Sequence, residues 1–348
     1  MSPYQKNLSM RKSFLIALGS VLTLSNGILA QADEKKFEPS GKMTGTVFAN
    51  YHYDLTDNAE KKSQFELLRA YVGHLYTFSD QISSRIILDA CYDGKAFTTF
   101  VKNAALEYRL NNEILIEGGM IGTHGFDTQE KFFGYRYVLE TLMDRDKFIS
   151  SADLGVKITY KPSEMVEFRA SVANGDGYKK IQDDFGMHRS SIDVIFHPVK
   201  KITVKAYYDF LPKRDTAIKN EDFLRTQNNM SLFLGYEEPS FFRIGAEYDM
   251  QVNSENKNDQ KLYGISAYGA YLINKFEFFV RFDQLMSNKT GSDADPWNFN
   301  KDHSFILGGL QLTPVKGIKL ALNYRHYLPS NKDLPVNELT YLNLEYRF

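Results

Sequence analysis

The stretch 337–348, which reads NELTYLNLEYRF, decides the fold prediction. Apolar side chains occupy every second position of it, at Leu342, Leu344, Tyr346 and Phe348. A period of two is the pattern of a β-strand, because successive side chains of a strand point to opposite faces. The last residues of a soluble domain usually fray, whereas this pattern continues to the final aromatic residue. We therefore expect this segment to pair with another strand and to close a barrel.

Fifteen further strand-like segments precede this one, and no long helical pattern lies between them except in one insert. The expected strands are 41–54, 65–78, 82–92, 97–110, 114–122, 152–161, 165–174, 187–197, 202–211, 227–237, 241–251, 261–272, 276–285, 304–313 and 318–327. Together with 337–348 they predict sixteen strands.

The links between these segments alternate between very short and long. The short ones are 79–81, 111–112, 162–164, 198–201, 239–240, 274–275 and 314–317, and the longer polar ones include 55–63, 175–185, 212–226, 253–260 and 286–303. Short turns on one rim and long loops on the other are typical of transmembrane barrels. The sequence therefore predicts an all-β fold, a transmembrane antiparallel up-and-down β-barrel of about sixteen strands. A soluble β-sandwich is the alternative, but it gives no reason for the alternation.

Charged residues alternate with the apolar ones along most of the expected strands. In residues 152–161, for example, Leu154 and Val156 lie on one face while Asp153 and Lys157 lie on the other. So many charges cannot occupy a dry core, and sixteen strands enclose enough space for an aqueous channel. Aromatic residues gather beside the short links, where an interfacial girdle is expected: Tyr76, Phe78, Tyr108, Tyr160, Phe196, Tyr236, Phe241, Phe276, Tyr346 and Phe348.

Residues 1–32 have the pattern of a cleaved secretory signal. Basic residues precede an apolar run at 14–24, which is too short to span a bilayer, and Ala30 and Ala32 provide the small residues of a cleavage site. Cleavage after Ala30 and an uncleaved anchor are the alternatives. The expected organisation is a signal peptide over 1–32, a short periplasmic segment over 33–40 and the barrel over 41–348.

Composition and motifs exclude several classes of function. The net charge of −1 gives no basic field for a nucleic acid, and the lone Cys91 provides no disulfide framework. The sequence has no G-x-S-x-G, no H-E-x-x-H and no glycine-rich phosphate loop, so we expect no enzyme, no cofactor and no metal. His124 beside Asp127, or His303 beside Asp302, leaves a barrel hydrolase open as an alternative.

The insert at 123–151 follows the fifth expected strand. Its apolar residues Phe132, Tyr135, Leu139 and Leu142 have the spacing of one helical face, which predicts a short helix packed against the barrel wall. An outward surface loop is the alternative. An inward insert would offer the channel Lys131, Arg136, Glu140, Asp144, Arg145, Asp146 and Lys147. From the wall we expect Arg69, Arg85, Asp89, Glu117, Arg169, Arg243 and Arg281 to join them at a constriction or solute-binding site.

The architecture and the terminal Phe348 resemble those of bacterial outer-membrane porins. The segments 133–137 (FGYRY) and 151–155 (SADLG) look similar to porins of the phosphate-selective superfamily. This resemblance implies a bacterial outer-membrane location in contact with lipid, recognition of the last strand by the barrel-assembly machinery, an inward loop and a homotrimer. Phosphate specificity is not carried over, because acidic residues nearly balance the expected lumen-facing Arg and Lys residues.

The sequence therefore predicts a porin, a water-filled channel for passive diffusion of small hydrophilic solutes and ions. The alternatives are a barrel enzyme that hydrolyses lipid or protein, and a closed structural barrel. The preferred solute, the sign of the ion selectivity and any Ca²⁺ site in the outer loops do not follow from the sequence.

Overall fold

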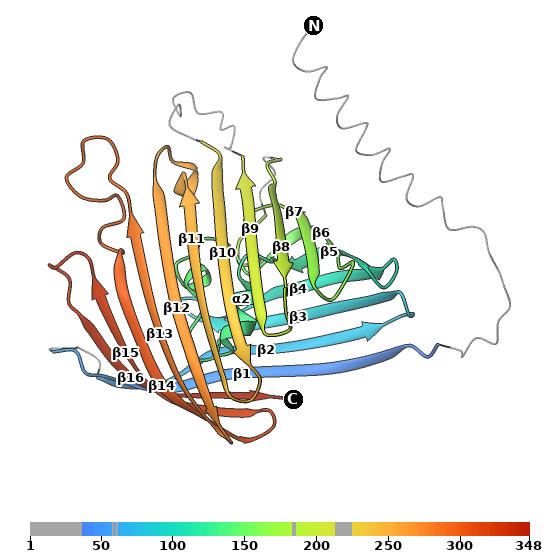
Figure 1. The fold of residues 1–348 in the computed structure, drawn as a ribbon, viewed down its shortest axis with the longest axis horizontal. Coiled ribbons are helices and arrows are strands. Elements are labelled where there is room, and N and C mark those ends of the chain that lie inside the picture. The colour runs from blue at the N-terminus through green and yellow to red at the C-terminus, as the bar shows by residue number, and fades with distance from the viewer. Residues whose placement is uncertain (1–36, 58, 60–61, 183–185, 213–224) are drawn as a thin grey trace, which may run out of the picture. The chain divides into compact units, whose positions relative to one another are not determined.

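The computed structural model describes residues 37–57, 59, 62–182, 186–212 and 225–348. Sixteen antiparallel strands follow one another around a ring, and each pairs with its neighbours in the chain (Figure 1). The first strand pairs with the last, so the sheet is a closed barrel. The predicted fold class is confirmed. The expected signal peptide lies outside the described residues.

The strands agree with the expected segments to within a residue or two at each end. They are β1 (Ser40–Asp54), β2 (Ser63–Thr77), β3 (Ile82–Tyr92), β4 (Phe97–Arg109), β5 (Ile114–Gly122), β6 (Ala152–Tyr160), β7 (Val166–Ala173), β8 (Arg189–Phe196), β9 (Ile202–Leu211), β10 (Gln227–Glu238), β11 (Phe242–Val252), β12 (Lys261–Ile273), β13 (Phe276–Ser287), β14 (His303–Val315), β15 (Ile318–Pro329) and β16 (Asn337–Arg347). A short 3₁₀ turn, η1 (Ser254–Asn256), lies between β11 and β12.

The barrel closes at Gly45 and Phe348. The Gly45 N–H donates to the Phe348 carbonyl at 3.0 Å, and the Phe348 N–H donates back to the Gly45 carbonyl at 3.1 Å. A Cβ atom at position 45 would overlap the Phe348 ring, so only glycine leaves room for that ring on the outer face. Closure satisfies the backbone groups that an open sheet edge would leave unpaired.

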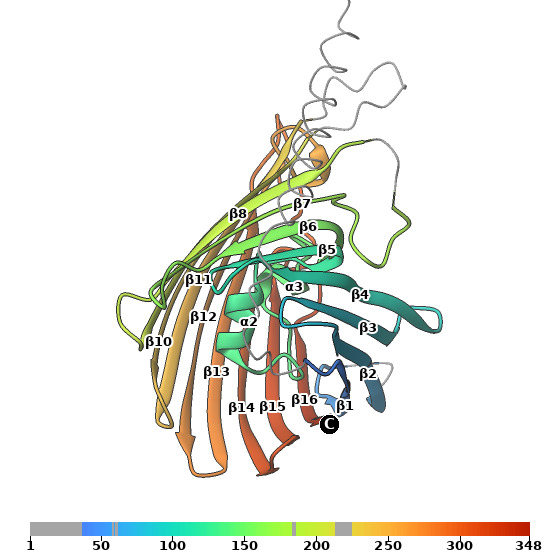
Figure 2. The same ribbon diagram turned by 90° about the vertical axis from the view of Figure 1, so that its right-hand side faces the viewer.

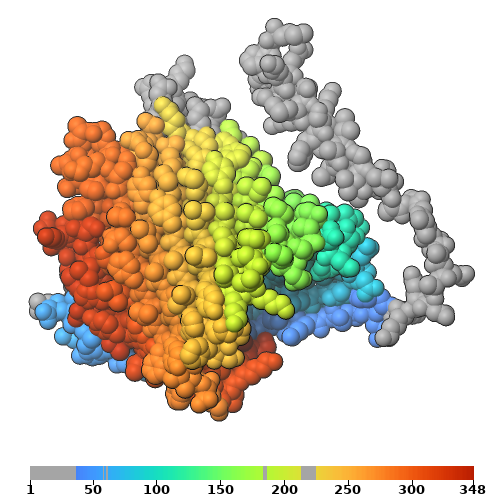
Figure 3. All heavy atoms as spheres, in the orientation of Figure 1, coloured from blue at the N-terminus to red at the C-terminus, as the bar shows by residue number. Residues whose placement is uncertain are grey.

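The two faces of the sheet differ as the alternation predicted. On β13, Phe278 and Val280 lie on the outer face and are 50% and 56% exposed. Arg281 lies on the inner face, against the insert, and is 1% exposed. Figure 3 shows the outer side chains of β8 to β14 as a continuous wall. An apolar outer belt with a polar interior is the pattern that a bilayer imposes on a barrel.

The insert between β5 and β6 lies inside the barrel, where its two short helices, α2 (Asp127–Phe133) and α3 (Leu142–Arg145), face the inner wall (Figure 2). The prediction of one helical face from Phe132 to Leu142 was wrong. Gly134 adopts a left-handed conformation with φ 79° and ends α2, so residues 134–141 are irregular. Among the described residues, no helix is long and apolar enough to cross a membrane.

Candidate pore constriction

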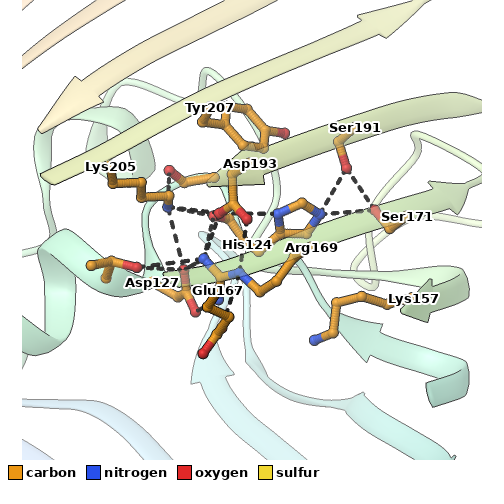
Figure 4. A network of polar contacts seen from close by, with 12 residues as sticks. His124, Asp127, Lys157, Glu167, Arg169, Ser171, Ser191, Asp193, Lys205 and Tyr207 are labelled. Atoms are coloured by element: carbon orange, nitrogen blue, oxygen red, sulfur yellow. Dashed lines mark hydrogen bonds and ion pairs between the residues drawn. The ribbon is translucent and has the colours of Figure 1, made fainter. Parts of the chain in front are cut away.

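A cluster of ion pairs fixes the start of the insert to the wall. Asp127, at the start of α2, accepts hydrogen bonds from Arg169 of β7 at 2.7 and 3.0 Å, and Lys205 of β9 lies 3.4 Å away (Figure 4). Burial raises the pKa of Asp127, but the charges of Lys205 and Arg169 outweigh this effect and hold it well below its usual range. The root of the insert is therefore a buried, fully paired electrostatic contact.

His124 extends this cluster towards two serines. Its ring lies 3.3 Å from the Asp193 carboxylate, and its Nε2 lies 3.2 Å from Ser171 Oγ and 2.9 Å from Ser191 Oγ (Figure 4). Burial lowers the pKa of His124, while the neighbouring Asp193 opposes that shift. The imidazole is 1% exposed, so it is a neutral link between β7, β8 and the insert.

In the described part of the chain, five wall cations donate to backbone carbonyls of the insert. They stand on β7, β9, β11, β13 and β15, and the pairs are Arg169 with His124 (3.5 Å), Lys205 with His124 and Gly125, Arg243 with Phe133 (3.2 Å), Arg281 with Glu140 (2.6 Å) and Arg325 with Val138 (2.7 Å). An irregular loop has few backbone partners of its own, and buried carbonyls need donors. The long cationic side chains of the wall supply those donors, which explains how a loop remains in place inside the barrel.

Apolar packing completes the contact between the insert and the wall. The Tyr135 ring stacks on Phe279 with 4.3 Å between centroids, and its hydroxyl donates to Glu277 at 2.8 Å. A Cβ atom at Gly264 of β12 would overlap the Leu142 side chain, so Gly264 forms a socket for α3. Tyr135 and Leu142 are both fully buried.

The other face of the insert carries one arginine surrounded by three acids. Arg136 lies 2.9 Å from Glu130, 3.1 Å from Glu140 and 3.3 Å from Asp144. The side chains of Glu130 and Glu140 remain 31% and 33% exposed, so they are in contact with water.

The three acids differ in how readily they ionise. Burial raises the pKa of Glu130 and of Asp144 above the usual values, although Arg136 opposes the shift at both. Burial also raises the pKa of Glu140, but Arg136, a backbone hydrogen bond, Arg69 and Arg325 together lower it to about 2. Glu140 is therefore the most persistent negative charge on this face.

The facing wall is basic and aromatic. Arg69 of β2 pairs with Asp89 of β3 at 2.5 Å, and the hydroxyl of Tyr178 donates to the same carboxylate at 2.6 Å. Lys102 of β4 stands over the Tyr71 ring, 4.8 Å from its centroid. Both Arg69 and Lys102 contribute to the field at the insert acids.

A cavity of about 180 Å³ lies between the insert and this wall. Its lining includes Phe48, Asn50, Glu66, Leu68, Arg69, Cys91, Tyr92, Arg136, Val138, Leu139, Glu140, Lys179, Arg325 and Tyr341. Arg136 and Glu140 of the insert and Arg69 of the wall thus line the same cavity. Asp144 is paired with Arg136, and Asp89 is paired with Arg69. These five are the sequence-predicted site residues that the structure brings together.

The remaining site residues predicted on the insert lie elsewhere. Arg145 bonds Asp283 at 2.6 Å and Asp146 at 2.9 Å, which fixes the end of α3 to β13. Lys131 is exposed and lies 3.7 Å from Asp127, and Lys147 is exposed with a left-handed φ of 61°.

The remaining wall residues fall into two groups. Arg85 pairs with Glu107 at 2.5 Å and Glu117 with Lys157 at 2.8 Å, both on the wall that the insert leaves free. Arg169, Arg243 and Arg281 lie beneath the insert and bond to it.

Sequence reasoning missed four residues at the constriction: Lys102, Glu130, Tyr178 and Arg325. Lys102 falls at a β-bulge of β4: Ile87 of β3 pairs with Asn103, the next residue Leu88 pairs with Val101, and Lys102 has no partner in this register. Simple alternation from the inward-facing Asn103 would therefore place Lys102 on the outer face. Arg325 follows the alternation on β15, but the alternation alone does not distinguish it from lumen-facing arginines outside the site. Tyr178 reaches inward from a loop, and no period in the sequence reveals that.

Comparison with known proteins identifies the fold. The sequence matches no family model and no curated protein. OmpF of Salmonella typhi, in complex with daunomycin, has a TM-score of 0.67 at 12% identity, over 88% of this chain and 97% of that chain. A double mutant of the Rh. blastica porin has a TM-score of 0.58 at 14% identity, over 89% of this chain and 100% of that chain. The trimer form of in-vitro folded OmpT, an outer membrane protein of Vibrio cholerae, has a TM-score of 0.57 at 13% identity, over 89% of this chain and 99% of that chain. The chain therefore has the fold of the porins.

Proposed function

We propose that this protein is an outer-membrane channel through which small hydrophilic solutes and ions diffuse passively. The observation that carries the proposal is the insert bonded to the inner wall, with its charged face turned to the remaining opening. Glu130 and Glu140 on that face are 31% and 33% exposed and therefore contact water, and Arg136 between them is 13% exposed. If the barrel were closed, these charges would lose their water, and each would then cost desolvation energy.

The charges set up a field across the opening. Acids of the insert face Arg69 and Lys102 of the wall and Arg325 beside the insert. Such a field orients dipolar molecules and favours those that exchange hydration water for polar contacts, and it excludes apolar ones. Among the described residues, five carboxylates (Glu66, Asp89, Glu130, Glu140 and Asp144) face five cations (Arg69, Lys102, Arg136, Lys179 and Arg325). This near balance of charge supports little net selectivity between cations and anions at pH 7.

The setting of the channel follows from the same proposal. The apolar outer face fits contact with lipid, the N-terminal pattern fits export through a cleaved signal peptide, and the last strand with Phe348 fits recognition by the assembly machinery. A homotrimer has support from the trimer form of the similar OmpT structure. We also propose a relation to the porins of the phosphate-selective superfamily, but we do not propose phosphate specificity for this protein.

A hydrolase is the second candidate, because His124 contacts Asp193, Ser171 and Ser191 in the manner of a Ser-His-Asp triad. Two observations oppose it. The Asp193 carboxylate is bonded by Arg169 and approached to 3.6 Å by Lys205, which weakens its support of a charged imidazole. The cavity described above is lined by other residues. A fluorophosphonate probe should leave both serines unlabelled; labelling that disappears in Ser171→Ala or Ser191→Ala would favour the hydrolase.

Planar-bilayer recording tests the channel directly. The purified protein should produce discrete open steps in KCl, and its reversal potential in a salt gradient at pH 7 should show only slight selectivity between cations and anions. Absence of conductance from correctly folded barrels would contradict the proposal and leave the closed barrel or the hydrolase.

A further inference from the structure

The amide of Asn50 is the feature of the cavity that needs explanation. Asn50 is 5% exposed on the inner face of β1, and neither its Oδ1 nor its Nδ2 has a hydrogen-bond partner among the described residues. Buried polar side chains almost always have partners, and both atoms of this amide belong to a residue that lines the cavity. A molecule from the aqueous lumen is therefore expected to supply both a donor and an acceptor.

Two charged groups on either side of Asn50 also lack charged partners. Arg325 bonds only the neutral oxygens of Asn323 and Val138 and stacks on Tyr341, 3.6 Å from the ring centroid, and no carboxylate in the described part of the chain lies within 4 Å of it. Its guanidinium is held in place and ready for an anion.

Glu66 is the opposite case. It lies directly across from Asn50 in the β1–β2 register, and it accepts a hydrogen bond from the neutral Gln64. Its other neighbour is His52 at 3.4 Å, which is charged only if protonated. A cation beside Glu66 would complete its interactions.

The other charged groups that line the cavity are already satisfied. Arg69 is paired with Asp89, and Arg136 is paired with Glu140 and its neighbouring acids. Lys179 is exposed to water and stacks on Phe100 and Tyr178. Apart from the solvated Lys179, the groups that remain in the described lining are one cation, one anion and one amide between them.

We infer that this cavity is a binding site for a small zwitterion of the α-amino-acid type. Its carboxylate binds Arg325 and the Asn50 Nδ2, and its ammonium binds Glu66 and the Asn50 Oδ1. The volume of about 180 Å³ is several times what one water molecule requires. The inference rests on the proposed channel for access of the solute, and it specifies which hydrated solutes are retained at the constriction.

The test uses four probes on single channels of the full-length protein at pH 7: alanine, lactate, ethanolamine and glucose. Lactate lacks the ammonium, ethanolamine lacks the carboxylate, and glucose lacks both charges. Alanine should reduce the open-channel current in a saturable manner and at lower concentration than the other three.

Two variants locate the site. Glu66→Gln should weaken the alanine effect roughly tenfold, the change expected from loss of about one charge-assisted hydrogen bond, and leave the lactate effect unchanged. Arg325→Gln should remove the advantage of alanine over ethanolamine. In the described part of the chain, Glu66 makes no hydrogen bond or ion pair with the insert, so its variant tests the site even if Arg325→Gln moves residue 138. Arg85→Gln changes a lumen-facing arginine that is paired with Glu107 and does not line the cavity, so this matched control should leave the alanine effect at its wild-type level.

Each failure has a separate meaning. An equal or stronger effect of glucose would overturn the zwitterion assignment in favour of a polyol site. A non-saturable alanine effect, or one unchanged in Glu66→Gln, would mean that the cavity holds only water. A barrel without conductance would contradict the proposed function instead, and calorimetric titration of the detergent-solubilised protein with alanine then decides the inference on its own.

Discussion

The inner wall of the barrel has two sectors that carry similar residues in different surroundings. In the covered sector, from β7 to β16, cations such as Lys205 and Arg281 are each 1% exposed and bond the insert. In the open sector, from β2 to β6, Arg85 is 41% exposed and pairs with an acid of the neighbouring strand. Lumen-facing charges are thus of two kinds: those of the covered sector bond the insert, and those of the open sector pair with one another across neighbouring strands.

The largest difference between the sectors should appear in stability. Arg281→Ala removes two hydrogen bonds to the buried Asp283, both 2.8 Å, and the donor to the Glu140 carbonyl. Breaking such a buried pair should lower the free energy of unfolding by about 3 kcal/mol. Equilibrium urea unfolding in detergent measures the change.

Arg85→Ala is the control from the open sector. Its ion pair with Glu107 is largely solvated, so the loss should stay below about 1 kcal/mol. Equal losses in the two variants would remove the distinction between covered and open wall.

The socket at Gly264 offers a smaller test of the covered sector. Gly264→Val would overlap Leu142 and should cost about 1–3 kcal/mol, together with noisier open-channel current as α3 loosens. The matched variant is Gly118→Val on β5, where a new Cβ atom would meet no described atom within 4 Å. Identical unfolding curves and identical current noise for the two would show that α3 does not depend on this socket.

The pH dependence of selectivity probes the open side of the insert. The pKa values of Glu130 and Asp144 are raised, so these groups lose their negative charge first as the pH falls from 7, while Glu140, with a pKa of about 2, stays ionised. The cation-to-anion permeability ratio should therefore fall on acidification, before ordinary carboxylates titrate. Screening over about 8 Å at physiological salt limits the change to roughly twofold. Reversal potentials between pH 7 and 4 check this shift.

A double variant tests whether Glu130 and Asp144 are the groups that titrate in that measurement. Glu130→Gln with Asp144→Asn should show the low ratio already at pH 7 and little further change on acidification. A wild-type pH response in the double variant would mean that other groups titrate.

The barrel itself was predictable from the sequence, because in a membrane-type barrel lipid-facing apolar residues alternate with lumen-facing polar residues along each strand. The alternation of Asp153, Leu154 and Val156, for example, already assigns inside and outside. The position of the insert was left open between inward and outward, since its contacts with Arg243, Arg281 and Arg325 join residues more than a hundred positions apart.

The constriction was predictable only in part. Arg136, Glu140 and Asp144 came from the charge of the insert, and Arg69 and Asp89 from strand alternation. The pattern did not distinguish Arg281, which bonds a carbonyl beneath the insert, from Arg85, which faces water. That distinction depends on where an irregular loop settles, and irregular backbone has no sequence period. The bulge at Lys102 and the orphaned amide of Asn50 are tertiary features of the same kind.

The most direct test of the account is the single-channel conductance of a variant that lacks residues 130–147. This deletion removes the charged face of the insert and the aromatic residues that hold it, so the account predicts a larger open step than in the wild type, measured in the same salt and bilayer. Only inserted barrels conduct, so each step recorded comes from a folded molecule. A step of unchanged size would contradict the central claim that the insert narrows a water-filled channel.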